Sequence, residues 1–202
     1  MATMGIGAGV AKPLEYVRFR GLSIKYGTIG MNLDAANNVI VEDCDLSLHS
    51  DSSLTVDGSL NSVVNVVANY AGCRGISVAG GDQPSLTRGN NTVTGCSAQR
   101  YARWTRTYNP GLSFGGVGNT YSGNLVANAP HIGMIGGGND HLFFNNTFER
   151  LVYEVSDSGA WYSGRSWAHR GSKLYNNTFL HCKDLEPTYL GSLATHGIYY
   201  DD

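Results

Sequence analysis

The feature that most constrains this chain is a short pattern that occurs seven times along it. Each copy has a usually small residue, an apolar residue, any residue and a second apolar residue, with glycine or aspartate close behind. The copies lie at residues 30–34, 53–58, 75–80, 111–116, 131–136, 159–164 and 197–202. Their spacing of roughly 20 to 38 residues is within or somewhat below the periods of stacked repeat proteins. The recurrence therefore predicts similar structural units that stack on one another.

A second pattern lies between copies of the first one. It has an apolar residue, two variable residues, cysteine or asparagine, another variable residue and a final apolar residue. Examples are residues 41–46, 93–98, 121–126, 143–148 and 174–179. Each repeat thus supplies two short alternating strands, which place one set of side chains inside and the other outside. One such pair cannot bury its own apolar face, so neighbouring coils must stack. We predict an all-β fold, a right-handed parallel β-helix of about seven coils.

Stacking also explains three asparagines that share one phase of successive repeats, namely Asn124, Asn146 and Asn177. A buried amide is costly unless its donors and acceptor are hydrogen-bonded. Coils stacked about 4.8 Å apart allow each amide to bond the next coil. We therefore predict an asparagine ladder. The Asn-Asn-Thr triplets that begin at Asn90, Asn145 and Asn176 are also glycosylation motifs, but the repeat itself accounts for them.

Composition supports short strands joined by tight bends. The 202 residues include 27 glycines and 5 prolines, and only 15% of residues are charged, which argues against a helical bundle. The net charge of −2 predicts no general attraction to nucleic acid or to an anionic membrane. The sequence contains no run of 18 or more apolar residues, so we expect no segment that spans a bilayer. The four cysteines, Cys44, Cys73, Cys96 and Cys182, lack metal-site spacing and are interpreted as small buried residues.

The repeat covers most of the chain as one expected domain. Residues 1–13 form a poorly defined N-terminal segment without a convincing signal peptide, and residues 14–202 form the solenoid. The chain stops within the last copy of the pattern, which predicts a fragment of a longer helix. Longer intervals between copies place loop insertions near 80–110, 137–158 and 165–196. Insertions project from one edge of a solenoid and usually carry its function.

The first insertion ends in a segment, residues 99–110, that is rich in arginine and aromatic side chains. Aromatic faces stack on sugar rings, and guanidinium groups bind hydroxyls or carboxylates. Arg103, Trp104 and Arg106 are therefore candidate substrate-binding residues. A solvated loop with paired arginines explains the segment equally well, and stacking on nucleobases would need a wider basic face.

Residues 130–141 hold two histidines and an asparagine around a run of three glycines. We treat His131, Asn139 and His141 as candidate substrate-binding residues, because glycines allow a ligand to approach the backbone closely. The two histidines are ten residues apart, which makes a weak metal site. No Gly-Lys-Ser/Thr follows the glycines, so they do not form a phosphate loop.

The third segment, residues 156–171, concentrates tryptophan, tyrosine, arginine and histidine beside one carboxylate. Aligned with residues 197–202, it occupies the equivalent place on the neighbouring coil. Strand alternation then points Tyr199 and Asp201 outward, with Trp161 and Asp157 on the same face. Hydrolysis of a glycosidic bond needs such a set, one carboxylic acid and one carboxylate beside a sugar-binding surface.

Several stretches of the second half resemble a known family. They read RWTRTYNPG, GVGN, PHIG, GGNDH, DSGAWYSGR and GIYYDD, and the pattern DxGAxYxGRxW is the most specific. Over residues 98–202 the chain is similar to glycoside hydrolase family 141, secreted proteins with a pectate-lyase-like β-helix and with α-L-fucosidase and xylanase activities on plant cell-wall glycans. The resemblance implies an extracellular protein that acts on a polysaccharide or oligosaccharide.

In that family two aspartates carry the chemistry, which implies catalytic roles for Asp157 and for Asp201 or its neighbour Asp202. The remaining candidate substrate-binding residues of this part are Trp161, Tyr162, Arg165, Trp167 and Tyr199. In straight strands Asp157 would lie about 13 Å from the level of Asp201. A catalytic pair needs about 5–9.5 Å, so we expect a bend near residues 158–159.

Two other functions fit the same residues. A catalytically silent glycan-binding or structural solenoid would keep the aromatic residues without a carboxylate pair at catalytic distance. A uronate lyase would use Arg165 or Arg170 as base, with Ca²⁺ held by residues such as Asp34, Asp57 or Asp140. We expect no cofactor for hydrolysis, no nucleic-acid partner and no membrane span.

Overall fold

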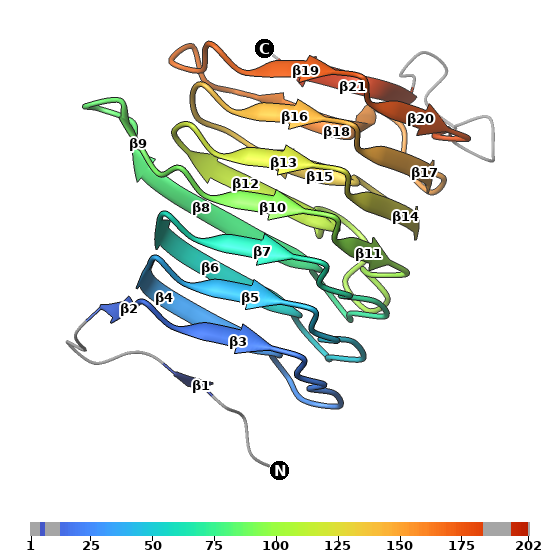
Figure 1. Ribbon diagram of the computed structural model, residues 1–202. Helices are drawn as coiled ribbons and strands as arrows, with labels where there is room; N and C mark the ends of the chain where they lie inside the picture. The colour runs from blue at the N-terminus through green and yellow to red at the C-terminus, as the bar shows by residue number, and fades with distance from the viewer. Residues whose placement is uncertain (1–4, 7–12, 184–194, 202) are drawn as a thin grey trace.

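The structure is a computed structural model that describes residues 5–6, 13–183 and 195–201 of the chain (Figure 1). The described residues form short strands that wind around one axis, with the blue N-terminal strands and the red C-terminal strands at opposite ends of the molecule (Figure 1). Three sheets run along that axis. The parallel β-helix that the repeat predicts is therefore confirmed.

The largest sheet contains the copies of the first sequence pattern. Its strands, in order, are β1 (Gly5–Ile6), β4 (Met31–Asn37), β6 (Leu54–Ser59), β8 (Ile76–Asp82), β12 (Leu112–Gly116), β15 (Met134–Gly136), β18 (Ser158–Gly164) and β21 (Thr195–Asp201). Strand β2 (Leu14–Glu15) also pairs with β4. Strand β9 (Thr87–Arg88) pairs antiparallel with the end of β8, whereas the other strand pairs of the described chain are parallel.

The two smaller sheets contain the second sequence pattern. The seven-stranded sheet consists of β3 (Arg18–Arg20), β5 (Ile40–Glu42), β7 (Ser62–Val64), β10 (Thr92–Thr94), β13 (Thr120–Ser122), β16 (Leu142–Phe144) and β19 (Lys173–Tyr175). The four-stranded sheet consists of β11 (Ser97–Gln99), β14 (Leu125–Ala129), β17 (Thr147–Leu151) and β20 (Thr178–Leu180). Earlier coils continue the latter sheet as single bridges that join Ser23, Asp45, Val67 and Ser97.

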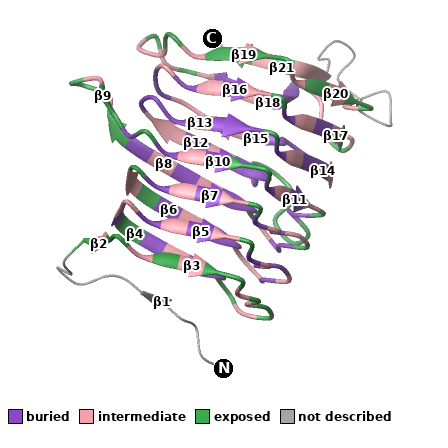
Figure 2. Ribbon diagram, in the orientation of Figure 1, coloured by how far each residue is buried: buried purple, intermediate pink, exposed green. Residues whose placement is uncertain are grey.

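The core is built from columns of inward side chains, and each coil contributes one side chain to each column. Register pairs the residues of one column in the largest sheet, Met31, Leu54, Ile76, Leu112, Met134, Trp161 and Ile198. A column of the seven-stranded sheet contains Phe19, Val41, Val63, Val93, Tyr121, Phe143 and Leu174. More and less buried positions alternate along most strands (Figure 2). The period-2 pattern of the sequence thus becomes the inside and outside of the solenoid.

The bends between strands are left-handed corners, with three in each coil. The first corner precedes the seven-stranded sheet and contains Tyr16, Asn38, Leu60, Asn90, Gly118, Asp140 and Gly171, all with positive φ. The second follows that sheet and contains Gly21, Asp43, Asn65, Gly95, Gly123, Asn145 and Asn176, also with positive φ. Asparagine, aspartate and glycine tolerate this backbone region best. The triplets therefore place their first asparagine in a corner and their second inside.

The predicted asparagine ladder is confirmed. The side-chain amide of Asn124 donates to Oδ1 of Asn146 at 2.9 Å, and that of Asn146 donates to Oδ1 of Asn177 at 3.0 Å. The same amides donate to backbone carbonyls, so their polar atoms are satisfied inside the core.

A second ladder, which the sequence analysis missed, follows the first corner. The backbone N–H of Asn61 donates to Asn91 Oδ1, and the N–H of Asn91 donates to Asn119 Oδ1, both at 2.9 Å. His141 continues this column, because its Nδ1 accepts the N–H of Asn119 at 3.1 Å. The sequence did carry a signal for this ladder. An Asn or His stands two residues before each of four core residues of the seven-stranded sheet, namely Val63, Val93, Tyr121 and Phe143.

The predicted orientation of Trp161 is wrong. It is 1% exposed and stacks on Phe114, with ring centroids 5.5 Å apart. The sequence pattern took Ala160 as the inward residue, but register pairs Met134 with Trp161. Both Ala160 and Trp161 are buried, because the chain bends just before them and brings two successive residues against the core.

Candidate functional site

The outer face of the last two strands of the largest sheet carries a polar cluster. Strands β18 and β21 pair Tyr162 with Tyr199 and Gly164 with Asp201. Strand alternation sends Tyr162, Tyr199 and Asp201 outward, while Trp161 and Tyr200 meet on the inner side with ring centroids 5.0 Å apart. The outward orientation expected for Tyr199 and Asp201 is therefore present. The cluster has two halves, one around each aspartate.

Asp201 is held by two donors. The hydroxyl of Tyr162 donates to its Oδ2 at 2.5 Å, and Nε of Arg165 donates to the same oxygen at 2.6 Å. The Asp201 side chain is 9% exposed, whereas that of Arg165 is 72% exposed. The carboxylate raises the pKa of Arg165, while burial and then the hydrogen bond to Asp201 raise the pKa of Tyr162. The guanidinium and the phenol thus hold the carboxylate in one position.

Asp157 is bound by the tyrosine of the neighbouring strand. The hydroxyl of Tyr199 donates to its Oδ1 at 2.8 Å, and this hydrogen bond raises the pKa of Tyr199 to about 12. The rings of Tyr162 and Tyr199 meet edge to face with centroids 5.6 Å apart. Asp157, Tyr199, Tyr162 and Asp201 therefore form one connected chain of contacts.

A bend brings Asp157 within reach of this cluster. Asp157 has a φ of 56°, and a Cβ added at Gly159 would lie 2.8 Å from the carbonyl oxygen of Trp161. In an extended strand that oxygen would be much farther away. The same Cβ would lie 2.7 Å from Cβ of Tyr199, so only glycine fits here. The bend expected near residues 158–159 is present.

A hollow opens beside the Asp201 half of the cluster. Arg165, Ser166, Trp167 and Asp201 line it, and it has a volume of about 500 Å³. Trp167 is 100% exposed. A fully exposed indole beside a carboxylate and a guanidinium is a surface to which a sugar ring can bind. We call Asp157, Tyr162, Arg165, Tyr199 and Asp201, together with this hollow, the aspartate cluster.

Three of the other candidate residues lie inside the solenoid. His141 is fully buried in the second ladder, where burial lowers its pKa to about 4. Asn139 is 3% exposed, and its backbone forms parallel β-bridges with Val117 of the preceding coil and Arg170 of the next. Together with Trp161, these residues shape the core and do not face a surface where a glycan could bind. The glycine run that suggested them marks close packing between coils.

His131 lies just under the surface. It is 4% exposed, and the ring of Tyr108 covers it with centroids 5.0 Å apart. Burial lowers its pKa. The residue is therefore shielded by the loop of the first insertion, and reaching it would require Tyr108 to move.

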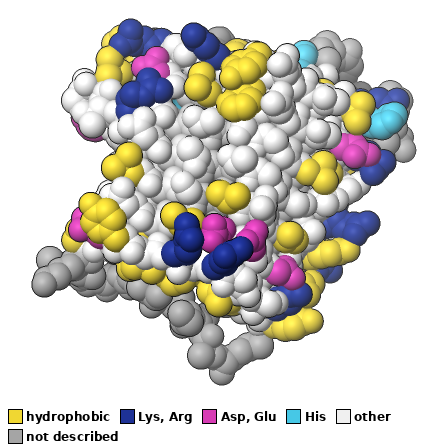
Figure 3. Space-filling model, viewed as in Figure 1, with side chains coloured by type: hydrophobic (Ala, Val, Ile, Leu, Met, Phe, Trp, Pro, Cys, Tyr) yellow, Lys and Arg dark blue, Asp and Glu magenta, His cyan; other side chains and the backbone are white. Residues whose placement is uncertain are grey.

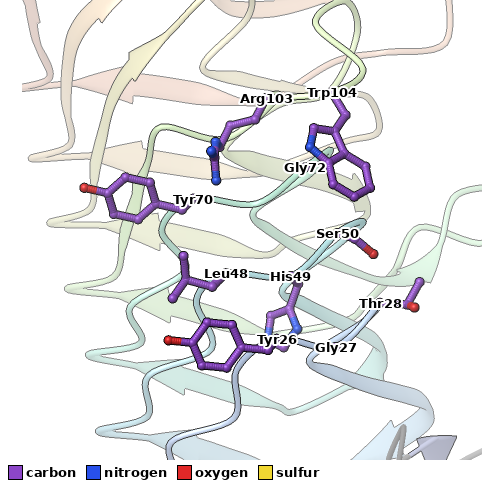
Figure 4. A pocket seen from close by; sticks show the side chains of 10 residues that line it. All are labelled: Tyr26, Gly27, Thr28, Leu48, His49, Ser50, Tyr70, Gly72, Arg103 and Trp104. Carbon is purple, nitrogen blue, oxygen red and sulfur yellow. The ribbon is translucent and has the colours of Figure 1, made fainter. Parts of the chain in front are cut away.

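The arginine-rich loop belongs to a different part of the surface. Arg103 and Trp104 line a hollow of about 400 Å³ with Tyr26, Leu48, His49 and Tyr70, among others (Figure 4). Arg106 forms a bidentate pair with Glu154, at 2.6 and 2.5 Å. This hollow and the one at Asp201 share no lining residue. The sequence analysis grouped residues that the fold assigns to two separate surfaces, and it missed Tyr26 and Tyr70.

Of the predicted catalytic residues, Asp202 lies outside the described residues. Within the described ranges, no group of three or more His, Cys, Asp or Glu side chains could hold a metal ion. The four cysteines are unpaired; Cys44 and Cys96 are buried as expected, whereas Cys73 and Cys182 are only partly buried. No helix among the described residues is long and apolar enough to cross a membrane.

The geometry defines a solenoid of stacked parallel coils with a carboxylate cluster on its outer surface. A family model described as the right-handed β-helix region matches residues 3–110, just over half of the chain. The chain therefore belongs to the right-handed β-helix family. No curated protein matches it. The family match covers the regular early coils, whereas both aspartates of the cluster lie after it.

Proposed function

We propose that this protein binds a polysaccharide at the aspartate cluster and hydrolyses a glycosidic bond there, outside the cell. The observation that carries the proposal is the chain of contacts from Asp157 through Tyr199 and Tyr162 to Asp201. It brings two carboxylates, distant in the sequence, onto one face of adjacent strands. Glycoside hydrolysis requires a pair of carboxyl groups with different roles.

The surroundings of the two carboxyl groups suggest which role each takes. Asp201 lies beside the positive charge of Arg165, which suits a group that acts as an ionised nucleophile or base. Asp157 is the second carboxyl group of the cluster, held in place by the hydroxyl of Tyr199, and by elimination we assign it the role of the acid that protonates the leaving oxygen. Trp167 would stack on a sugar bound in the hollow at Asp201.

The test is release of reducing ends from a panel of plant cell-wall polysaccharides. We expect turnover by the wild-type protein, none detectable for Asp201→Asn, and a loss of about 10²–10⁴-fold for Asp157→Asn. Asp82→Asn is the matched control, since it makes the same charge change at the hairpin of β8 and β9. Equal turnover by the Asp201→Asn and Asp82→Asn proteins would overturn the proposal.

One observation favours a second function, a non-catalytic glycan-binding site. Asp201 already accepts two hydrogen bonds and is 9% exposed, so its access to a sugar carbon is restricted. The same panel separates the two functions if affinity is measured alongside turnover. Binding that depends on Trp167, without product from any substrate, would establish the binding function and exclude hydrolysis.

A further inference from the structure

The third corner of the solenoid forms a column of outward side chains along the axis. Each member has a positive φ and lies three residues after a bridge or after the start of a strand in the four-stranded sheet. The column contains Tyr26, Leu48, Tyr70, Arg100, Asn128, Arg150 and His181. Backbone bonds connect its neighbours, for example from Arg100 N to the carbonyl of Ala127. Successive members are therefore about 4.8 Å apart along the axis.

The first part of this corner is aromatic. Tyr26 is 66% exposed and Trp104 is 72% exposed. Figure 4 shows Tyr26, Leu48 and Tyr70 in one column, with Arg103 and Trp104 entering from the coil above. Together they border the hollow of about 400 Å³. Large exposed aromatic rings around an open hollow provide flat apolar faces on which rings of a ligand can stack.

The middle of the corner is cationic. The guanidinium groups of Arg100 and Arg103 lie 5.3 Å and 5.9 Å from the centre of the Tyr70 ring. Among the described residues, neither guanidinium forms an ion pair with a carboxylate. Arg106 and Arg150, in contrast, pair with Glu154 and Glu149. Two arginines are thus positioned by an aromatic ring and retain their charge for an anionic ligand.

Three neighbouring hollows along this corner share lining residues, and together we call them the third-corner groove. The hollow at Tyr26 shares Tyr70 and Arg103 with a second, of about 330 Å³. The second shares Asn128 and Tyr153 with a third, of about 370 Å³, which reaches His181 and Lys183. On the right-hand edge of Figure 3, basic side chains alternate with hydrophobic ones. The groove therefore crosses many coils, which suits a linear polymer better than a small molecule.

We propose that this third-corner groove binds an acidic polysaccharide, a chain whose sugars carry carboxylates. The sugar rings stack on Tyr26, Tyr70 and Trp104, and the carboxylates pair with Arg100 and Arg103. Glu154 and Glu149 already pair with Arg106 and Arg150, so the groove keeps few unpaired cations for the closely spaced phosphates of a nucleic acid. The site goes beyond the proposed function, since it shares no residue with the aspartate cluster.

The test is the affinity of the full chain for polygalacturonate oligomers, compared with a neutral galactan of the same length. We expect the double variant R100Q/R103Q to lose at least tenfold in affinity for the acidic polymer. R18Q/R20Q is the matched control, because it removes two exposed arginines from β3 and should change nothing. Affinity should also fall as salt is raised, because the attraction involves exposed charges.

Trp104→Ala provides a second variant on an exposed side chain, and it should weaken binding to the same polymer. Asp157→Asn and Asp201→Asn should bind as the wild type does, whether or not the protein is a hydrolase, so the two proposals fail separately. Equal affinity for the neutral galactan, equal losses in R18Q/R20Q, or tighter binding of single-stranded DNA of the same charge would overturn the proposal.

Discussion

The early coils and the last coils of this solenoid are built on the same plan but carry different chemistry. In the early coils, β6 and β8 pair Leu54 with Ile76, and the inward column consists of aliphatic side chains. In the last coils the core becomes aromatic, with Phe114, Phe143 and Trp161 in mutual contact. Their strands also present the aspartate cluster outside.

The difference shows how a solenoid acquires a site without changing its fold. Leu54 and Ile76 are 22 residues apart, whereas Trp161 and Ile198 are 37 residues apart. The longer last interval contains the exposed segment around Trp167, and the preceding interval, 27 residues from Met134 to Trp161, contains the bend at Gly159. Short coils hold the structure together, and longer coils have room for chemistry.

Replacement of Trp161 by alanine should have the largest effect on stability. The ring is fully buried between Phe114, Phe143 and Tyr200, so truncation leaves a cavity that the last coils cannot fill. We expect a loss of about 3–5 kcal/mol in the free energy of unfolding, measured by urea denaturation. The control Trp167→Ala, at a fully exposed position, should change it by less than about 0.5 kcal/mol. Similar losses in both variants would contradict the assigned core.

His141 should make stability depend on pH, whereas the asparagines that precede it in the ladder should not. Burial lowers its pKa to about 4, so as pH falls the unfolded chain takes up the proton first. Stability is therefore full above about pH 6.5 and falls toward pH 4, by about 3 kcal/mol from this residue.

The variant His141→Asn extends the asparagine ladder by one coil and removes the titrating group. The difference in unfolding free energy between wild type and variant, followed by urea denaturation from pH 7 to pH 4, isolates the contribution of His141. A constant difference across that range would show that the histidine is not buried in the neutral form.

Asn146→Ala should show a smaller loss that tests the ladder itself. Its Oδ1 accepts two hydrogen bonds from Asn124, and its amide donates to Tyr121 and Asn177. Truncation leaves buried partners unsatisfied, and we expect a loss of roughly 1–3 kcal/mol. Its neighbour Asn145 lies in an exposed corner with a φ of 56°, so Asn145→Gly should be nearly neutral. Thermal melting of both proteins gives the comparison.

The smallest effect concerns the titration of Tyr199 and leaves stability unchanged. The carboxylate of Asp157 raises the pKa of this phenol to about 12, from an ordinary 10.0. In Asp157→Asn the pKa should fall back toward 10. Ultraviolet titration, with Tyr199→Phe subtracted to isolate this residue, measures the change. An unchanged titration would mean that the two side chains do not meet in solution.

Much of the fold follows from the local pattern of the sequence. Alternation identifies the inward columns of the early coils, such as Leu54 and Ile76, and the recurrence of Asn124, Asn146 and Asn177 predicts the ladder. Prediction failed where coils differ in length. There, alternation gave Trp161 the wrong side, because a bend at Gly159 lets two successive residues face the core.

The candidate site was predictable only in part. The residues around Asp157 and the tyrosine of the last coil stand out as a chemical group, and strand alternation places Tyr199 and Asp201 outside. His141 and Asn139 also resembled binding residues, but both stabilise the stacking of coils from within. The third-corner groove was missed because its members come from separate coils, and no short segment contains more than a few of them.

By itself, the sequence determined that this chain stacks in parallel coils, since apolar alternation with a recurring period leaves no other way to bury its strands. The tertiary structure decided which polar groups meet. The hydrogen bonds from Tyr199 to Asp157 and from Tyr162 to Asp201 cross between coils that are 37 residues apart in register. Such contacts depend on the length of the segment between the two strands and on each bend within it. No local sequence pattern contains that information.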